Sequence, residues 1–306
     1  FSVQQVSDSP PAGFSHYLRI TTTDDQPAPA VNDTYQIGQP VPHDSIVDFD
    51  WGRTSGRKAT LSFSVRSSLT GSFSGVILNP FTDLSYVFTY TIPVANQWIR
   101  RTISIAAPPT SSPTFGPHDD IGVHVIFSLG AGSAFSTTSV NQWVSGNFRA
   151  QTGQTAVVGT LGATWDLTGV QLEPGTATTF EYLPLAMQQE MAYRFTQVFR
   201  QSSIANVIGS GIAVSTTVAL ISVPLPVPLH RLPVNLISFT AAADFELVRA
   251  GPTEIDATSV SLLSPDQSSE HNLELSVTVA AGLTAGEALL LQVDANALVI
   301  DAELYG

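Results

Sequence analysis

The stretch GVQLEPGTATTFEYLPLAMQQEMAYRF, from Gly169 to Phe195, changes its pattern twice. Up to Leu172, apolar residues alternate with polar ones, which is typical of a strand with one buried face. Pro174, Gly175 and a run of threonines then predict a turn. From Leu185 the apolar spacing becomes helical. The stretch therefore predicts a strand, a turn and one helix near the middle of the chain.

The predicted helix runs from Leu185 to about Phe199. Its apolar side chains fall on one stripe, formed by Met187, Met191, Phe195 and Phe199. Such a stripe has to be buried, and two arrangements would bury it. One is a seam between two domains of a single chain, and the other is an axis shared with copies of the same chain. We favour the shared axis, and we therefore predict an oligomer interface at these four residues.

Short alternating runs, separated by turn residues, lie on both sides of the predicted helix. In Thr60–Val65 the alternation is strict, so apolar and polar side chains point to opposite faces. About eight such runs before the helix favour a two-sheet sandwich of the jelly-roll type. We expect an all-β chain with an N-terminal jelly-roll β-sandwich in residues 1–184, a linking amphipathic helix in 185–200, and a smaller antiparallel β domain in 201–306.

Composition narrows the classes of partner. The 306 residues include 12 Lys and Arg against 25 Asp and Glu, for a net charge of −13, and no cysteine. Nucleic-acid binding needs clustered basic residues, so it is not expected. No apolar run approaches the roughly 18 residues of a membrane-spanning helix, so membrane insertion is not expected either. Without cysteine, the chain has no disulfide framework and no thiolate nucleophile.

Several pieces of the sequence together resemble bacteriophage fibre and tail proteins. In these proteins a strand reading TGVQLE-G is followed by ATPFEYRP and by a helix near ELA-CQRYY. The matching pieces here are Gly169–Gly175, Ala177–Tyr182 and Glu190–Phe195. Ser7–Phe14 resembles the TDAPTGF segment of the same family, and Thr60–Gly71 resembles its TLSFWVKSS-TG strand and turn.

The resemblance covers residues 1 to about 200, and it departs from the family at Thr179, where Pro is usual, and in lacking the Cys. It implies a jelly-roll similar to carbohydrate-binding modules, carried on a fibre or spike of an extracellular virion. On this basis we expect a non-enzymatic homotrimer that contacts host-surface polysaccharide. Because Phe1 begins as though inside a strand, we also expect an upstream segment that joins other virion proteins. The alternatives are a purely architectural decoration, collar or adaptor protein and, less favoured, a glycan depolymerase.

Sugar binding needs aromatic rings for the apolar face of a pyranose and polar groups for its hydroxyls. Trp51 lies in an acidic loop between Asp50 and Arg53 and combines a ring with a carboxylate and a guanidinium. Trp143 follows Gln142 in a second polar segment. We predict these five residues as the carbohydrate-binding site.

Two other tryptophans and two carboxylates receive a structural interpretation. Trp98 precedes an alternating strand, and Trp165 begins one, so both are predicted to pack. Glu173 and Glu181 have the residue type that glycan cleavage requires. Both lie in the motif shared with the fibre proteins, however, and we interpret them as part of its structure.

Calcium is the one metal that the sequence suggests. Jelly-roll modules often hold it through loop carboxylates, and Asp24, Asp25 and Asp166 are candidate ligands. The chain has no calcium-loop spacing of the helix–loop–helix type. We therefore expect no cofactor, with a structural calcium as the alternative.

Overall fold

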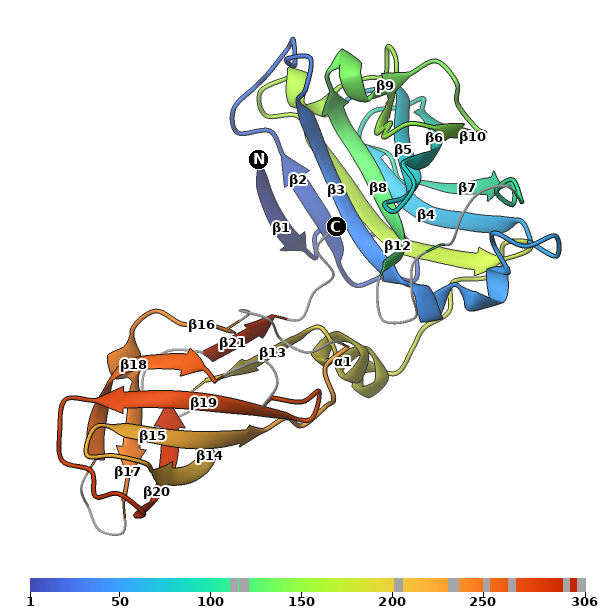
Figure 1. The fold of residues 1–306 in the computed structure, drawn as a ribbon. Coiled ribbons are helices and arrows are strands. Elements are labelled where there is room, and N and C mark those ends of the chain that lie inside the picture. Colours follow the sequence, from blue (N-terminus) through green and yellow to red (C-terminus); the bar gives the residue numbers. More distant parts are fainter. Residues whose placement is uncertain are drawn as a thin grey trace. The chain divides into compact units, whose positions relative to one another are not determined.

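The computed structural model shows an all-β chain with two compact units, Phe1–Tyr182 and Leu183–Leu304 (Figure 1). The predicted fold class is confirmed. The chain divides at Tyr182, and the helix belongs to the second unit. The structure describes residues 1–110, 115, 121–200, 206–230, 237–249, 254–263, 268–293 and 298–301.

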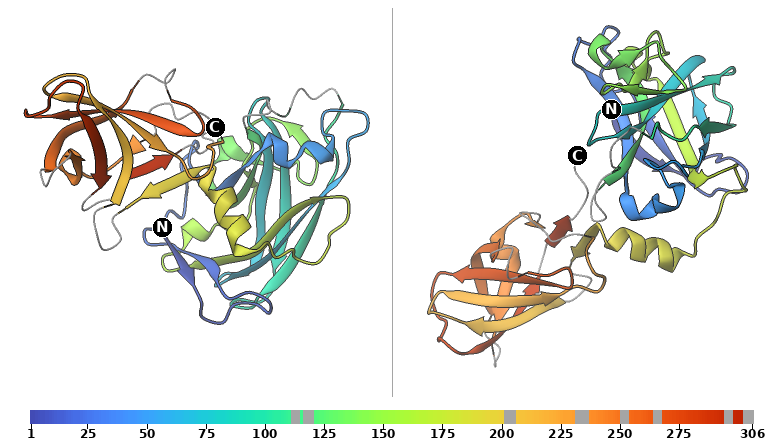
Figure 2. Two further views of the ribbon diagram at one scale, coloured as in Figure 1. Left: turned by 90° about the horizontal axis from the view of Figure 1, so that it is seen from below. Right: turned by 45° about the vertical axis from the view of Figure 1, so that its right-hand side comes forward.

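The first unit is a sandwich of two five-stranded antiparallel sheets (Figures 1 and 2). The first sheet has the order β1 (Ser2–Val6), β2 (Tyr17–Thr21), β12 (Thr164–Pro174), β4 (Ala59–Ser67) and β7 (Ile99–Ile105). The second sheet has the order β10 (Trp143–Ser145), β6 (Leu84–Ile92), β5 (Gly71–Asn79), β8 (Ile121–Ala131) and β3 (Thr34–Pro42). Two short parallel strands, β9 (Ser136–Thr137) and β11 (Ala150–Gln151), form a separate pair.

The alternation in β4 explains how the sandwich closes. Leu61, Phe63 and Val65 are fully buried between the sheets, and the Phe63 ring meets the ring of Phe127 from the second sheet at 4.9 Å. Burying each of these side chains contributes about 2 kcal/mol. The polar residues of the other face are also buried, with Ser64 only 6% exposed. Other parts of the chain must therefore cover the outer face of the first sheet.

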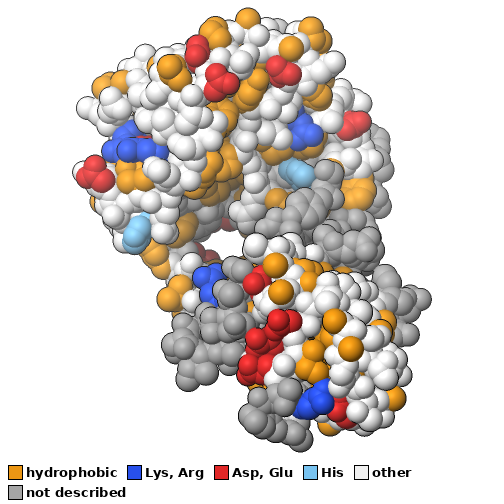
Figure 3. Space-filling view, turned by 90° about the vertical axis from the view of Figure 1, so that its left-hand side faces the viewer, with side chains coloured by type: hydrophobic (Ala, Val, Ile, Leu, Met, Phe, Trp, Pro, Cys, Tyr) orange, Lys and Arg blue, Asp and Glu red, His pale blue; other side chains and the backbone are white. Residues whose placement is uncertain are grey.

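The second unit is a closed antiparallel barrel with a small sheet beside it. The barrel has the order β14 (Asn206–Ala213), β15 (Val218–Pro224), β19 (Asn272–Val279), β18 (Glu254–Leu262), β17 (Phe245–Val248) and β20 (Ala288–Val293). The small sheet joins β13 (Thr196–Phe199), β21 (Leu298–Asp301) and β16 (Ile237–Ser238). Acidic side chains gather on one face of this unit (Figure 3). The predicted smaller antiparallel domain is confirmed.

The helix is shorter than predicted. α1 spans Leu185–Tyr193, and Thr196–Phe199 forms β13, which pairs with β21. The prediction of one helix continuing to Phe199 is wrong for its last part. Thr196 and Val198 are β-branched and suit a pleated strand, and ladder hydrogen bonds to β21 replace those of a helix. A short apolar run cannot distinguish these two outcomes by its periodicity.

This change separates the four residues predicted to share one stripe. Met187 and Met191 lie on α1 and are 50% and 52% exposed. Phe195 lies beyond the helix and packs against the His230 ring at 5.1 Å. Phe199 lies on β13 and packs against the core of the second unit. The continuous four-residue stripe is therefore corrected to two exposed methionines. Within the described ranges, no helix is long and apolar enough to cross a membrane.

Candidate ligand-binding groove

The chain folds back over β12 within the stretch Gly169–Tyr182. Gln171 and Glu173 alternate on the outer face of the first sheet. The Glu173 carboxylate accepts hydrogen bonds from the N–H and hydroxyl of Thr178 at 2.9 and 2.8 Å. The Gln171 side-chain oxygen accepts the Glu181 N–H at 2.8 Å. These bonds fix residues 175–182, which we name the return segment, across the sheet.

The pKa of Glu173 is lowered by these bonds. Burial acts to raise the pKa of this carboxyl, but the hydrogen bonds from Thr178 and Gln171 and the positive charge of Arg100 outweigh it. The net effect is a pKa below the usual value of a glutamate. The motif that resembles the fibre proteins therefore works as a structural attachment, as the sequence indicated for Glu173.

The return segment places the rings of Phe180 and Tyr182 against the ring of Phe14. The centroids of Phe180 and Tyr182 lie 4.9 and 5.8 Å from that of Phe14, and the Tyr182 hydroxyl donates to the Gly13 carbonyl at 2.7 Å. Gly169, in the left-handed region at φ +61°, lies under the Phe14 ring, where a Cβ would collide with it. Only glycine satisfies both requirements at this position.

Trp98 faces this trio from the segment before β7. Its indole N–H donates to the Ser9 carbonyl at 2.9 Å, and its ring meets Tyr17 edge-on at 5.1 Å. The Arg66 guanidinium lies 4.6 Å from the ring centroid, a cation–π contact. The predicted structural role of Trp98 agrees with these contacts, yet part of the ring stays accessible.

Asp166 holds the charged layer beneath Trp98. It is 1% exposed and forms ion pairs with Arg19 at 2.9 Å and Arg66 at 2.8 Å. Both carboxylate oxygens accept hydrogen bonds from these guanidinium groups. This corrects the prediction that Asp166 is a calcium ligand. Asp24 and Asp25 lie in the loop after β2, and no group of three or more His, Cys, Asp or Glu among the described residues is placed to hold a metal ion.

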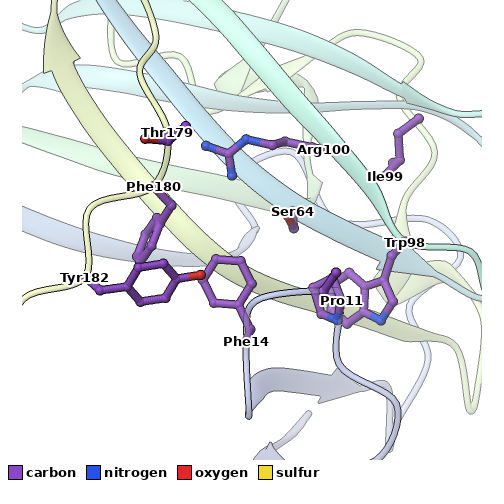
Figure 4. Close-up of a pocket in the computed structure, with 10 residues that line it drawn as sticks. Pro11, Phe14, Ser64, Trp98, Ile99, Arg100, Thr179, Phe180 and Tyr182 are labelled. Carbon is purple, nitrogen blue, oxygen red and sulfur yellow. The ribbon is translucent and has the colours of Figure 1, made fainter.

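These elements enclose a groove of about 560 Å³ on the outer face of the first sheet. Figure 4 shows Phe14, Phe180 and Tyr182 on one side and Trp98 with Pro11 on the other. The Arg100 guanidinium extends toward Thr179, and one of its nitrogens donates to Ser62 at 2.7 Å. The lining residues are Pro11, Ala12, Phe14, Ser64, Trp98, Ile99, Arg100, Thr179, Phe180 and Tyr182.

The predicted site around Trp51 is elsewhere in the sandwich and is closed. Trp51 is only 8% exposed, and its indole N–H donates to the Arg57 carbonyl at 2.7 Å. Its ring packs against Phe49 at 5.1 Å and against Phe115 at 5.4 Å. The structure therefore corrects the prediction that Trp51 presents an open ring, because core rings cover it.

The other predicted residues surround this packed ring. Trp143 meets Trp51 at 5.4 Å, is half-buried, and donates its indole N–H to the Ala106 carbonyl at 2.7 Å. Asp50 lies 3.5 Å from Arg53, whose side chain is 78% exposed, and Gln142 is exposed. The structure thus brings the two tryptophans together as a packing pair, with polar side chains at the surface.

Sequence reasoning missed the groove. Phe14 and Phe180 both lie in the pieces that resemble the fibre proteins, which was the available signal. Nothing in the local pattern shows that these pieces meet, because 165 residues of chain separate them. Arg100 was missed because an arginine on an alternating strand, here followed by Arg101, is indistinguishable in sequence from an ordinary exposed charge.

No protein-family model and no curated protein sequence matches this chain. Among solved structures, a CBM4 structure shares 14% identity and a TM-score of 0.28 over 55% of this chain and 91% of its own. An exo-β-agarase shares 12% identity and a TM-score of 0.30 over 58% of this chain and 23% of its own. A Paenibacillus sp. cycloisomaltooligosaccharide glucanotransferase complexed with cycloisomaltoheptaose shares 9% identity and a TM-score of 0.22 over 94% of this chain and 44% of its own. With TM-scores this low, none of these likenesses carries an argument about function.

Proposed function

We propose that this chain is a non-catalytic virion fibre or spike protein whose groove binds host-surface saccharide. The observation that carries the proposal is the joining of aromatic rings from Phe14, Trp98 and Phe180 with the polar groups of Ser64 and Arg100 around one groove. A pyranose has an apolar face for the rings and hydroxyls for the polar groups, so the lining matches the chemistry of a sugar.

Two carboxylates near the groove support binding over hydrolysis. Glycoside cleavage needs a protonated carboxyl as general acid and a second, free carboxylate. The pKa of Glu173 is lowered, so this carboxyl is a poorer proton donor than an ordinary glutamate. Asp166 is buried between Arg19 and Arg66 and is engaged through both oxygens. Both groups hold the fold together.

The groove is tested by screening the protein on a glycan array and then by calorimetry with the best ligand. Phe180→Ala is expected to abolish binding, because it removes one ring of the lining and leaves the sandwich core intact. Trp143→Ala is the matched control outside the groove. If Trp143→Ala abolishes binding and Phe180→Ala does not, the site is the one around Trp51. New reducing ends after incubation with polysaccharide would contradict the non-catalytic role.

A purely architectural role is the second candidate, and the exposed apolar side chains of α1 fit an assembly in either role. Leu185, Met187 and Met191 are 69%, 50% and 52% exposed on this helix. Apolar side chains in this number are costly to leave in water. We propose that copies of the chain cover them in a homotrimer. We expect neither nucleic acid nor membrane insertion in this assembly.

The assembly is tested by light scattering. The expected mass is close to three times 32.5 kDa. The double change Met187→Glu and Met191→Glu places charges in the proposed interface and should give monomers, whereas the control Gln188→Glu should not. A monomeric wild-type protein would contradict the trimer. A trimer that binds no glycan on the array would favour the architectural role.

A further inference from the structure

The outer face of the first sheet gathers arginines, although the protein is acidic overall. The chain has only 12 basic residues for 306 positions and a net charge of −13. Three of the arginines nevertheless meet on this face, carried by β2, β4 and β7: Arg19, Arg66 and Arg100. Positive charges that lie close together repel one another, and nearby carboxylates reduce this repulsion.

A nearby carboxylate forms ion pairs with two of these three arginines. Asp166 bonds to both Arg19 and Arg66, and the charge of Asp8 also acts on Arg19. The Glu173 oxygens accept hydrogen bonds from Thr178, and although the charge of Arg100 helps to lower the Glu173 pKa, the two form no ion pair. Within the described residues, Arg100 has Ser62 as its hydrogen-bond acceptor and no carboxylate partner.

Arg100 is also the only charged side chain among the ten that line the groove. Its guanidinium extends toward Thr179, with Ser64 on the neighbouring strand directly opposite in the register (Figure 4). A guanidinium presents a planar fork of donors that matches a carboxylate in a bidentate pair. The hydroxyls of Ser64 and Thr179, beside this guanidinium, can donate to the same anion or to sugar hydroxyls.

We infer that the groove selects saccharides that carry a carboxylate, such as uronic or sialic acids, and that Arg100 binds that carboxylate. The inference rests on the proposed saccharide binding and adds the substrate class. In this arrangement the rings of Phe14, Trp98 and Phe180 hold the apolar face of the sugar. Charge complementarity then supplies the preference for an acidic ligand over a neutral one of the same shape.

The test compares ligands that differ only in their charge. Calorimetry on the full chain uses oligogalacturonate and its methyl ester, sialyllactose and its methyl ester, and hyaluronan oligomers with their esters. For at least one pair the acid should bind about tenfold more tightly than the ester, as expected for one charged hydrogen-bonded pair. Arg100→Gln should lower the affinity for the acid to that for the ester and leave the ester unchanged. The preference should also weaken as salt rises.

Arg53→Gln is the matched control, because it removes the same charge from an exposed loop of the same sandwich and should leave the preference intact. Equal affinity for acid and ester in every pair that binds would overturn the selection of acids and leave saccharide binding standing. Retention of the preference for the acid in Arg100→Gln would likewise overturn the inference and leave saccharide binding standing. Failure of all acidic and neutral ligands to bind would overturn the saccharide function itself.

Discussion

The first unit holds two aromatic clusters that look alike in sequence and differ in what covers them. The closed cluster consists of Phe49, Trp51, Phe115 and Trp143, and its rings pack on one another at 5.1 to 6.1 Å. The groove cluster consists of Phe14, Trp98, Phe180 and Tyr182, and its two sides stand apart across a groove of about 560 Å³. Each cluster combines rings with charged neighbours, so residue types alone do not separate a packed site from an open one.

Hydrogen bonding does not separate the two clusters either. The indole N–H of Trp51 donates to the Arg57 carbonyl and that of Trp98 to the Ser9 carbonyl, at 2.7 and 2.9 Å. The difference lies in the cover. Core rings close over Trp51, whereas the groove beside Trp98 is bounded by the return segment, which hydrogen bonds hold at a distance from it. Satisfied polar groups are therefore compatible with either a structural or a binding tryptophan.

The largest expected effect is on stability at the closed cluster. Trp51→Ala should lower the free energy of unfolding by about 4 kcal/mol, because it empties the space of a buried ring and orphans a backbone carbonyl. Phe180→Ala should cost only about 1 kcal/mol, because that ring is partly solvated. Urea denaturation of both variants measures the difference. Comparable costs for the two substitutions would break the distinction between the clusters.

Asp166→Asn should lower the free energy of unfolding by about 3 kcal/mol, because it leaves two part-buried guanidinium groups without their charge partner. Asp24→Asn, in an exposed loop, is the control and should change stability by less than about 0.5 kcal/mol. Thermal and urea unfolding check both. An unchanged stability for Asp166→Asn would mean that the layer under Trp98 does not depend on this carboxylate.

Gly169→Ala should cost about 2 kcal/mol and also weaken ligand binding. A Cβ at Gly169 adds backbone strain at φ +61° and pushes the Phe14 ring from its position in the groove. Gly162→Ala is the matched control, because φ is +74° there but a Cβ would meet nothing within 4 Å. It should cost only the strain, about 1 kcal/mol. Equal costs, with binding retained, would show that Phe14 adapts.

Much of the fold follows from the sequence because strand alternation is a local property. The period of two in Thr60–Val65 decides which side chains face the sandwich core, and the structure places Leu61, Phe63 and Val65 there, although the polar residues of the other face are buried as well. The end of α1 was not predictable, because Thr196–Phe199 is a strand only by pairing with Leu298–Asp301, a partner remote in sequence. Helical spacing over so short a run leaves that choice to tertiary contacts.

The site was less predictable than the fold. We predicted that Trp51 binds sugar because of its charged loop, and that Trp98 packs. In the structure Trp51 is buried, whereas part of the Trp98 ring is accessible to solvent. Burial of a ring depends on which distant segments cover it. Here that depends on Gln171 and Glu173 holding the return segment, which brings Phe180 to Phe14. The motif was visible in the sequence, whereas the surface that it creates was not.

The smallest expected effect is a pH-dependent one at Glu173. The folded-state pKa of this carboxyl is lowered, so its contribution to stability is fully present above its unfolded pKa of about 4.3 and is lost as pH falls through the folded value. Glu173→Gln should therefore lower the Tm slightly at pH 7, and the difference from wild type should shrink below about pH 4.

The control for this change lies in the same return segment. Glu181→Gln removes an equal charge, but the described structure gives the Glu181 carboxylate no hydrogen bond, and the backbone N–H that meets Gln171 is kept. The difference in Tm between Glu181→Gln and wild type should therefore not shrink as the pH falls. Calorimetric scans between pH 3 and 7 compare the three proteins. If the Glu173→Gln difference persists undiminished at low pH, the ionised carboxylate does not hold the return segment. The open side of the groove would then depend on Gln171 and on ring packing, and binding of the uncharged methyl-ester ligands should be as strong at low pH as at neutral pH.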